Sequence, residues 1–239
     1  MAFFRGPNIV TKGLIVNYDA ASNRSYTTGT TFANLVEKGV NNLTVYGSPT
    51  YSDGQNGDGY GYFTMTSNQI TKYLQTTEDF PFPTTAITIE IWCRTTDATK
   101  NQALISYAVP GDSNENLLFY AGSNSQKMNL FGPVGNVSSG QALTENAWTQ
   151  VVYTRLSSSG ATLLYYNSVQ EFSTTLNAGT NFTTNGTLNF GQEQDSEGGG
   201  FDPAQCWVGD YSAIRIYDTV LTAPEIRQNY IAQKNRFGL

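Results

Sequence analysis

The chain has 239 residues, a net charge of −6 at pH 7 and no histidine. The acidic balance argues against nucleic-acid binding, which needs basic patches that release counterions, and the missing histidine excludes Ser-His-Asp and Cys-His catalysis within a single chain. Only 13% of the residues are charged, and Thr, Ser, Asn, Gln and Gly carry most of the polarity, a composition typical of a turn-rich β-protein and equally of a surface exposed outside a cell.

The N-terminal residues include no apolar run long enough for a signal peptide. No stretch of the chain approaches the roughly 18 apolar residues of a membrane span. We therefore expect synthesis in a cytosol without export by the usual route, and no membrane partner. Met1–Val10 is predicted to be a docking arm and residues 11–239 one β-domain, because no repeat or composition shift marks a further boundary.

Short strand-like segments follow along the chain, rich in β-branched and aromatic residues and bounded by turn-forming ones. They are Gly13–Asp19, Tyr60–Met65, Thr88–Arg94, Ala103–Tyr107, Leu117–Tyr120, Lys127–Phe131, Trp148–Arg155, Ala161–Tyr166, Thr187–Phe190 and Ser212–Tyr217. Because no helical period separates them, the predicted fold class is all-β, an antiparallel β-sandwich. Alternation puts Ile89, Ile91 and Cys93 on the same face of one strand. We expect Cys93 and Cys206 to be buried free thiols.

The pattern near the C-terminus predicts one helix. Thr222 stands at the N-cap position with Glu225 three residues on, which is the capping-box arrangement, and Pro224 lies in the first turn. Ile226 and Tyr230 then recur at helical spacing and supply an apolar stripe. We expect a short C-terminal helix that lies against the sandwich.

A segment near residue 200 concentrates oxygen-bearing side chains around a glycine-rich turn. Glu193 and Asp195 precede the run Gly198–Gly200, and Asp202 and Gln205 follow it. Calcium takes about six to eight oxygen ligands from a loop that can wrap around it. Carboxylates gathered this closely would repel one another without a cation. The sequence therefore predicts a Ca²⁺ site in this loop.

The same segment carries a specific motif. Within Gly191–Gly209 the residues Q-E-Q-D-S, G-G, F, Q and V-G recur in the order found in pentraxins. Matching positions continue from Ile216 to Ile226, and a weaker match covers Ser106–Phe119. On these motifs, the chain from about Ala86 to Tyr230 resembles pentraxin and laminin-G domains. That resemblance implies a concanavalin A-like jelly roll.

The resemblance also implies calcium ligands. Positions that bind calcium in pentraxins match Glu193, Gln194 (through its carbonyl), Asp195 and Gln205, and the position of Asp202 carries a carboxylate for a second ion.

The remaining pentraxin ligands are an Asp-Asn pair, and the match there is incomplete. Asn114 matches the asparagine, Ser113 replaces the aspartate, and Asp112 is the candidate substitute. One calcium ion is therefore expected, and a second is left open. Phe119 matches the aromatic residue of the pentraxin phosphocholine pocket, but the acidic partner is missing, so phosphocholine specificity does not carry over.

Both ends of the chain resemble laminin-G-like proteins of tailed bacteriophages, through Gly13–Asp19, Tyr46–Tyr51 and Ile226–Leu239. This resemblance implies a virion protein, made in the host cytoplasm, that decorates the capsid or belongs to a tail or fibre. It implies other virion proteins and a host surface glycan as partners. Pentraxin rings and trimeric phage fibres imply a homo-oligomer.

Two other functions remain open: a calcium-dependent glycan-binding lectin without a structural role, and a concanavalin-like glycoside hydrolase. The second arises because Glu193 to Glu197 spells E-x-D-x-E, similar to the catalytic strand of β-glucanases. A retaining glycosidase needs its two carboxyls about 5–5.5 Å apart, whereas residues i and i+4 of a strand lie about 13 Å apart. Gly198 would also end the strand. We favour the calcium loop and expect no enzyme.

Overall fold

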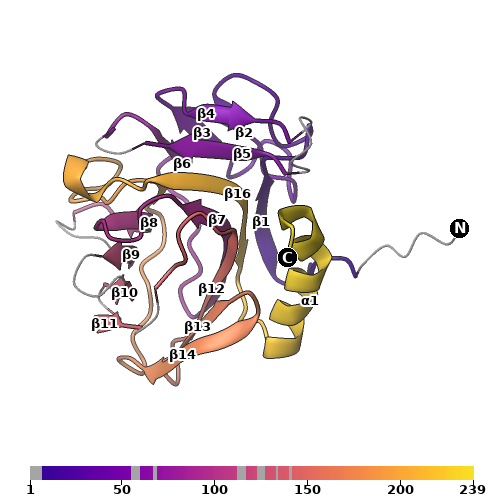
Figure 1. Cartoon of the computed structure of the whole chain (residues 1–239). Coiled ribbons are helices and arrows are strands. Elements are labelled where there is room, and N and C mark those ends of the chain that lie inside the picture. Colours follow the sequence, from indigo (N-terminus) through magenta and orange to yellow (C-terminus); the bar gives the residue numbers. More distant parts are fainter. Residues whose placement is uncertain are drawn as a thin grey trace, which may run out of the picture.

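The computed structural model describes residues 7–54, 60–66, 69–111, 117–122, 127–132, 134–139 and 142–239. Within these ranges the chain forms two β-sheets that face each other, with one α-helix packed on the outside (Figure 1). Every strand pairing in these ranges is antiparallel. The predicted all-β sandwich with a short C-terminal helix is confirmed.

The two sheets mix strands from all parts of the sequence. The first sheet has the spatial order β14 (Val169–Thr175), β13 (Ala161–Tyr166), β12 (Thr149–Leu156), β7 (Ala86–Thr95), β16 (Gly209–Tyr217), β5 (Tyr62–Met65) and β4 (Thr50–Ser52), and β1 (Leu14–Asp19) also pairs with β16. The second sheet has the order β11 (Val137–Ser138), β10 (Lys127–Phe131), β9 (Leu117–Gly122), β8 (Gln102–Ala108), β15 (Thr187–Phe190), β6 (Tyr73–Gln75), β3 (Leu43–Tyr46) and β2 (Thr31–Phe32).

Several of these strands carry too weak a pattern to be predicted. Strands β2, β3, β4, β6 and β11 are two to four residues long, which is shorter than the alternating runs that identify a strand. Strand β14 has the sequence VQEFSTT and lies at the edge of the first sheet with no fully buried residue. An edge strand needs little apolar character, so only its pairing with β13 reveals it.

The main hydrophobic core lies between the sheets. Ile89, Ile91 and Cys93 of β7 point into it, as the alternation predicts. Cys93 and Cys206 are both buried free thiols, which confirms that prediction. Burial of a large aliphatic side chain contributes about 1.5–3 kcal/mol, so the inner face of β7 is a principal source of stability.

The outer face of the first sheet is covered by α1 (Ala223–Gln233) and the following 3₁₀ turn η2 (Lys234–Phe237). The helix begins as predicted, because Glu225 Oε2 accepts a hydrogen bond of 2.8 Å from the backbone N–H of Thr222. Ile226 is wholly buried, whereas Tyr230 is half-buried. The most deeply buried polar residue of the helix is Asn229, which the apolar stripe does not predict.

Residues 7–10 run beside α1. The backbone N–H of Val10 donates to Oδ1 of Asn229 at 2.7 Å, and the Gln228 side chain donates to the carbonyl of Asn8 at 2.8 Å. The docking role expected for Met1–Val10 stays a prediction. In the described part of the chain, α1 falls short of the length and apolarity needed to cross a bilayer, and so does every other helix.

Candidate functional site

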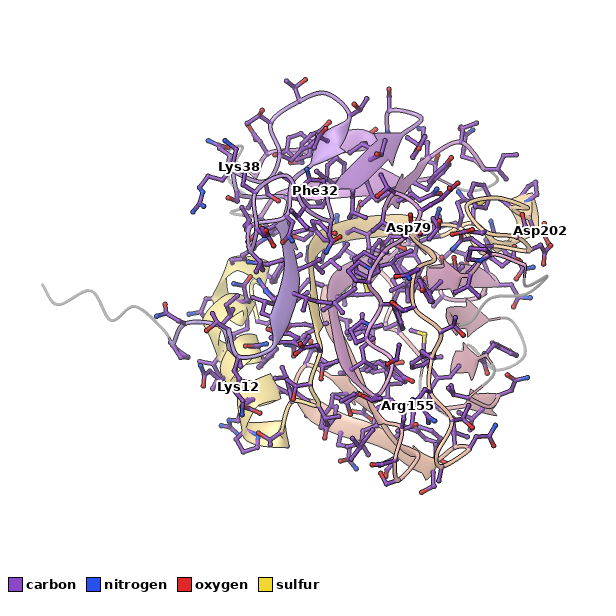
Figure 2. All side chains as sticks on the ribbon, turned by 180° about the vertical axis from the view of Figure 1, so that it is seen from behind. Lys12, Phe32, Lys38, Asp79, Arg155 and Asp202 are labelled. Carbon is purple, nitrogen blue, oxygen red and sulfur yellow. The ribbon has the colours of Figure 1, made fainter. Side chains whose placement is uncertain are left out.

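The loop between β15 and β16, residues 191–206, lies over the outer face of the second sheet. It is the orange loop at the left of Figure 1, on the opposite side of the molecule from α1. Figure 2 shows the same separation from behind, with Asp202 and Lys12 at opposite sides. We call residues 191–206 the acidic loop, because its charged residues are four carboxylates and no lysine or arginine.

Gln194 fastens the acidic loop to the sheet. Its side chain is fully buried and its Nε2 donates to Ser106 Oγ at 3.0 Å and to the Thr187 carbonyl at 3.1 Å. Its Oε1 accepts from the Gly198 N–H at 2.8 Å. The pentraxin resemblance implies that the main-chain carbonyl of Gln194 would bind the metal, while this amide group holds the loop in place.

Gln192 closes the base of the loop. Its Nε2 donates to the carbonyls of Gln69 and Lys72 at 2.9 and 3.0 Å, and its Oε1 accepts from the Cys206 thiol at 3.1 Å. Its backbone N–H donates to Asn189 Oδ1 at 3.1 Å. These bonds join both ends of the loop to β15 and to the turn before β6. They hold the base of the loop in a defined position.

The structure brings three of the predicted calcium ligands together. Glu193 Oε2 accepts from the Asp202 N–H at 3.3 Å, and Gln205 Nε2 donates to Asp202 Oδ2 at 3.2 Å. Asp202 also caps the short 3₁₀ turn η1 (Pro203–Gln205), because its Oδ1 accepts from the Ala204 N–H at 2.8 Å. Glu193 is only 4% exposed, so its carboxylate is held at a defined place.

Asp195 lies across the turn from these residues. A Cβ added to Gly200 would come within 2.9 Å of the Cβ of Asp195, and Gly200 has φ of +73°. Only glycine adopts that backbone region without strain. Gly200 therefore lets the two arms of the loop approach, with its backbone directly against Asp195 and Ser196.

Not every predicted site residue can be placed. Asp112 and Asn114 lie outside the described residues. Phe119 belongs to β9, where it stands opposite Ile105 of β8, and its side chain is outside the described part. The β8 strand also carries Ser106, which anchors Gln194, so β9 is next to the strand that supports the loop.

The donor types of the acidic loop fit calcium. Glu193, Asp195, Asp202 and Gln205 offer carboxylate and amide oxygens, which are the ligands that this hard cation prefers. Among the residues that the structure describes, no three acidic, cysteine or histidine side chains converge closely enough to hold a metal by themselves. Carbonyl, amide and water oxygens would have to complete the coordination.

The alternative of a catalytic strand does not fit the loop. Residues 193–197 form no strand, and Ser196 pairs with Gly199 in a tight turn. The two glutamates have different partners. Glu197 Oε1 accepts from the Thr187 hydroxyl at 3.2 Å, whereas Glu193 Oε2 accepts from the Asp202 N–H. Burial and the nearby charges of Glu78 and Asp79 raise the pKa of Glu197, against the opposing effect of the Thr187 hydrogen bond. Glu193 and Glu197 therefore do not share one sheet face.

Sequence reasoning misses an aromatic group beside the acidic loop, made of Tyr46, Tyr73 and Phe201. Alternation in Leu43–Tyr46 indicates which way Tyr46 faces. The pairing of β3 with β6, however, depends on sheet register, and short strands leave the register unreadable.

Comparison with known proteins identifies the family of the chain. Residues 66–227 match the concanavalin A-like lectin/glucanases superfamily. The chain is 28% identical to the C-reactive protein of Rattus norvegicus over 171 residues, which are 72% of this chain and 73% of that protein. It is also 28% identical over 143 residues to Sushi, von Willebrand factor type A, EGF and pentraxin domain-containing protein 1 of Rattus norvegicus. That match covers 59% of this chain and only 4% of the relative's length.

Solved structures share the fold. The native heptameric SAP-like pentraxin of Limulus polyphemus has a TM-score of 0.58 and 19% identity, over 71% of this chain and 81% of that one. Domain 4 of AbnA, a GH43 extracellular arabinanase of Geobacillus stearothermophilus in complex with arabinotriose, has a TM-score of 0.63 and 16% identity, over 92% and 98%. Since the family match extends over more than half of the 239 residues, the chain belongs to the concanavalin A-like lectin/glucanases superfamily.

Proposed function

We propose that this chain is a calcium-dependent glycan-binding module. The observation that carries the proposal is the contact of Glu193, Asp202 and Gln205 within a loop that Gln192 and Gln194 fix to the sheet. A preformed cluster of oxygen donors binds a cation without a large ordering cost, because the loop is already held in place.

Two likenesses support the proposal. The match to a C-reactive protein extends over 72% of the chain, and the superfamily match over residues 66–227 includes the acidic loop. Domain 4 of AbnA, which has the same fold, was solved with arabinotriose bound.

The roles within the loop follow from its contacts. Glu193, Asp195, Asp202, Gln205 and the carbonyl of Gln194 would hold the calcium, with Asp112 and Asn114 as further predicted ligands. A bound calcium ion supplies a positive centre that sugar hydroxyl oxygens can approach. The side chains of Gln192 and Gln194 do not bind; they orient the loop by donating to backbone carbonyls.

The test is a glycan array probed in millimolar calcium and again with a chelator, together with calorimetric calcium titration of Glu193→Gln. We expect sugar binding in calcium only, and a loss of calcium affinity of about tenfold or more in the variant, since each good charged ligand is worth above about 1.4 kcal/mol. Glu171→Gln, on the edge strand β14, is the matched control. Calcium binding that is absent, or equal in Glu193→Gln and the parent protein, would overturn the proposal.

A place on a phage particle is a further proposal, supported only by the likeness of the chain ends to phage laminin-G-like proteins. The relatives reported above come from a rat, a horseshoe crab and a bacterium. Immunogold labelling of phage particles with an antibody against this chain would test it, and unlabelled particles would end it. The homo-oligomer, which the heptameric Limulus pentraxin favours, is tested by light scattering, where a monomer mass would contradict it.

A further inference from the structure

Ser106 of β8 points out of the second sheet toward the acidic loop. Its neighbours Ile105 and Tyr107 belong to the main core, so the alternation of a strand turns Ser106 to the outer face of the sheet. Its side chain is nevertheless fully buried, and its hydrogen-bond partners belong to the acidic loop. A buried hydroxyl on this face therefore lies directly beneath the predicted calcium site.

The Ser106 hydroxyl bonds to the loop on either side of one predicted calcium ligand. Its Oγ donates to the main-chain carbonyl of Gln192 at 2.7 Å and accepts from Nε2 of Gln194 at 3.0 Å. The residue between these two is Glu193, whose Oε2 accepts from the Asp202 N–H at 3.3 Å. One hydroxyl thus holds the chain both before and after Glu193.

These bonds determine where the Glu193 carboxylate lies. The carbonyl of Gln192 belongs to the same planar peptide group as the N–H of Glu193, so the bond from Ser106 orients that plane. The bond from Gln194 fixes the chain on the other side. Because Glu193 is only 4% exposed, its side chain has little room for another rotamer, and the place of its carboxylate follows from the place of its backbone.

A second buried hydroxyl of the same sheet shows what a role in sheet pairing alone looks like. Thr76, directly after β6, accepts from the Leu188 N–H at 3.0 Å and donates to the Leu188 carbonyl at 3.5 Å. Both of these bonds go to the backbone of β15. Ser106 lies opposite Asn189 of that same strand, yet its hydroxyl bonds to the loop. Sheet pairing therefore does not account for the contacts of Ser106.

We infer that Ser106 is a positioning residue of the predicted calcium site and that it acts through Glu193. Residues that orient metal ligands by hydrogen bonds contribute to metal affinity although they do not touch the ion. Without the hydroxyl, the chain around Glu193 would have to be ordered when the ion binds, and that ordering costs free energy. The inference rests on the proposed function for the calcium ion, but the hydrogen bonds themselves need no metal.

The experiment compares Ser106→Ala with Thr76→Val, which removes the other hydroxyl and keeps the shape of its side chain. Calorimetric calcium titration of the full chain should show roughly ten- to a hundredfold weaker binding in Ser106→Ala, the usual effect of losing a residue that orients a ligand. Thr76→Val should bind calcium like the parent protein. Ser106→Cys puts a weaker donor at the same place. It should weaken binding in the same direction, and it carries the test if Ser106→Ala does not fold.

Two further measurements separate positioning from a loss of stability. In chelator, the Asp202 N–H, which donates to Glu193 Oε2, should exchange with solvent faster in Ser106→Ala than in Thr76→Val. In a Glu193→Gln background, Ser106→Ala should change calcium affinity by less than about threefold, because the effects of residues that act through one another do not add.

The outcomes also separate this inference from the calcium proposal. Equal calcium affinity in the parent protein and a Ser106 variant that is folded by circular dichroism would overturn the positioning role and leave the calcium proposal in place. Equal losses of affinity in Ser106→Ala and Thr76→Val would overturn it as well, because stability alone would then be responsible. So would a full effect of Ser106→Ala in the Glu193→Gln background. A parent protein that binds no calcium would remove the proposed function and this inference together.

Discussion

Asn229 and Glu90, which lie 139 residues apart in the chain, are joined by a buried hydrogen bond of 2.7 Å from Nδ2 to Oε2. Glu90 also forms a buried ion pair of 2.9 Å with Arg215. On its other side, Asn229 accepts from the backbone of Val10 at 2.7 Å. One amide thus connects the outer face of the first sheet, the C-terminal helix and the N-terminal segment.

Replacing Asn229 by leucine should destabilise the fold by at least about 3 kcal/mol. The substitution leaves the Val10 N–H and a Glu90 oxygen without this partner in a buried place, and each lost buried bond costs roughly 1–3 kcal/mol. Urea unfolding measures the change. Gln228→Ala is the neighbouring control, because its bond to Asn8 is exposed and should be worth less than about 1 kcal/mol. Similar losses in both variants would show that the buried amide has no special role.

Arg155 organises the turn that follows β14. It is fully buried, and its guanidinium donates to the carbonyls of Leu176, Thr180 and Asn177 at 2.9, 3.1 and 3.2 Å. Figure 2 shows it among the side chains of the lower part of the molecule. Burial lowers the pKa of Arg155 from its ordinary value. The carbonyl dipoles take the place of a carboxylate.

Arg155→Lys should therefore destabilise the protein by about 2 kcal/mol, because one ammonium group cannot span carbonyls that the planar guanidinium reaches together. Hydrogen exchange should show faster exchange at residues 176–180, while exchange in β16 changes only with global stability. Arg227→Lys, at an exposed position of α1, should leave both measurements unchanged. If hydrogen exchange at residues 176–180 is unchanged in Arg155→Lys, the guanidinium of Arg155 does not hold this turn in place.

The parts of the site that the sequence predicts are those formed by residues close in the chain. Glu193, Asp202 and Gln205 meet because a glycine turn separates them by only a few residues, and the capping box at Thr222 is local for the same reason. Tyr46 and Tyr73 meet only through the pairing of two short strands. Asn229 occupies a helical position where a polar residue normally faces water. Its hydrogen-bond partner Glu90 lies 139 residues away in the chain, so the local sequence does not reveal the contact. The register of β3 with β6 and the burial of Asn229 are set by contacts between distant parts of the chain, so the local sequence does not predict them.

The pair Asp19–Arg236 predicts a pH dependence of stability. Burial alone would raise the pKa of Asp19, but the charge and hydrogen bonds of Arg236, 2.8 and 2.9 Å away, bring it below its ordinary value. Because the folded pKa is lower than the unfolded one, the stabilisation is complete above the unfolded value of about 3.9. It is lost as the pH falls through the folded value.

Asp19→Asn should therefore be less stable than the parent by roughly 1–3 kcal/mol at neutral pH, the usual worth of hydrogen bonds to a charged group. The difference should shrink on going from pH 5 to pH 2. Chemical unfolding across that range measures it. Asp53→Asn serves as the control for removing a carboxylate elsewhere in the N-terminal part of the chain. If the stability difference between Asp19→Asn and the parent protein stays constant with pH, the contribution of Asp19 to stability does not depend on its charge.

Gly200 offers a test of whether loop geometry and calcium affinity are linked. A Cβ there would meet the Cβ of Asp195 at 2.9 Å and the backbone N of Ser196 at 3.1 Å, whereas a Cβ on Gly179 meets nothing within 4 Å. Both glycines have positive φ, +73° and +85°, so alanine at either position adds a similar backbone strain of about 1–2 kcal/mol. The collision with Asp195 is specific to Gly200.

In chelator, Gly200→Ala and Gly179→Ala should therefore both be less stable than the parent protein, and the loss should be larger for Gly200→Ala because of the collision with Asp195. Their calcium responses should differ far more. Calcium at a hundred times its dissociation constant stabilises a folded protein by about 2.7 kcal/mol, and Gly179→Ala should keep that gain, seen as a rise in melting temperature. Gly200→Ala should show little gain, because the added methyl group displaces Asp195, one of the predicted ligands, from its place in the loop. If both variants respond to calcium equally, the two arms of the acidic loop do not act together on the ion, and Asp195 is not among its ligands.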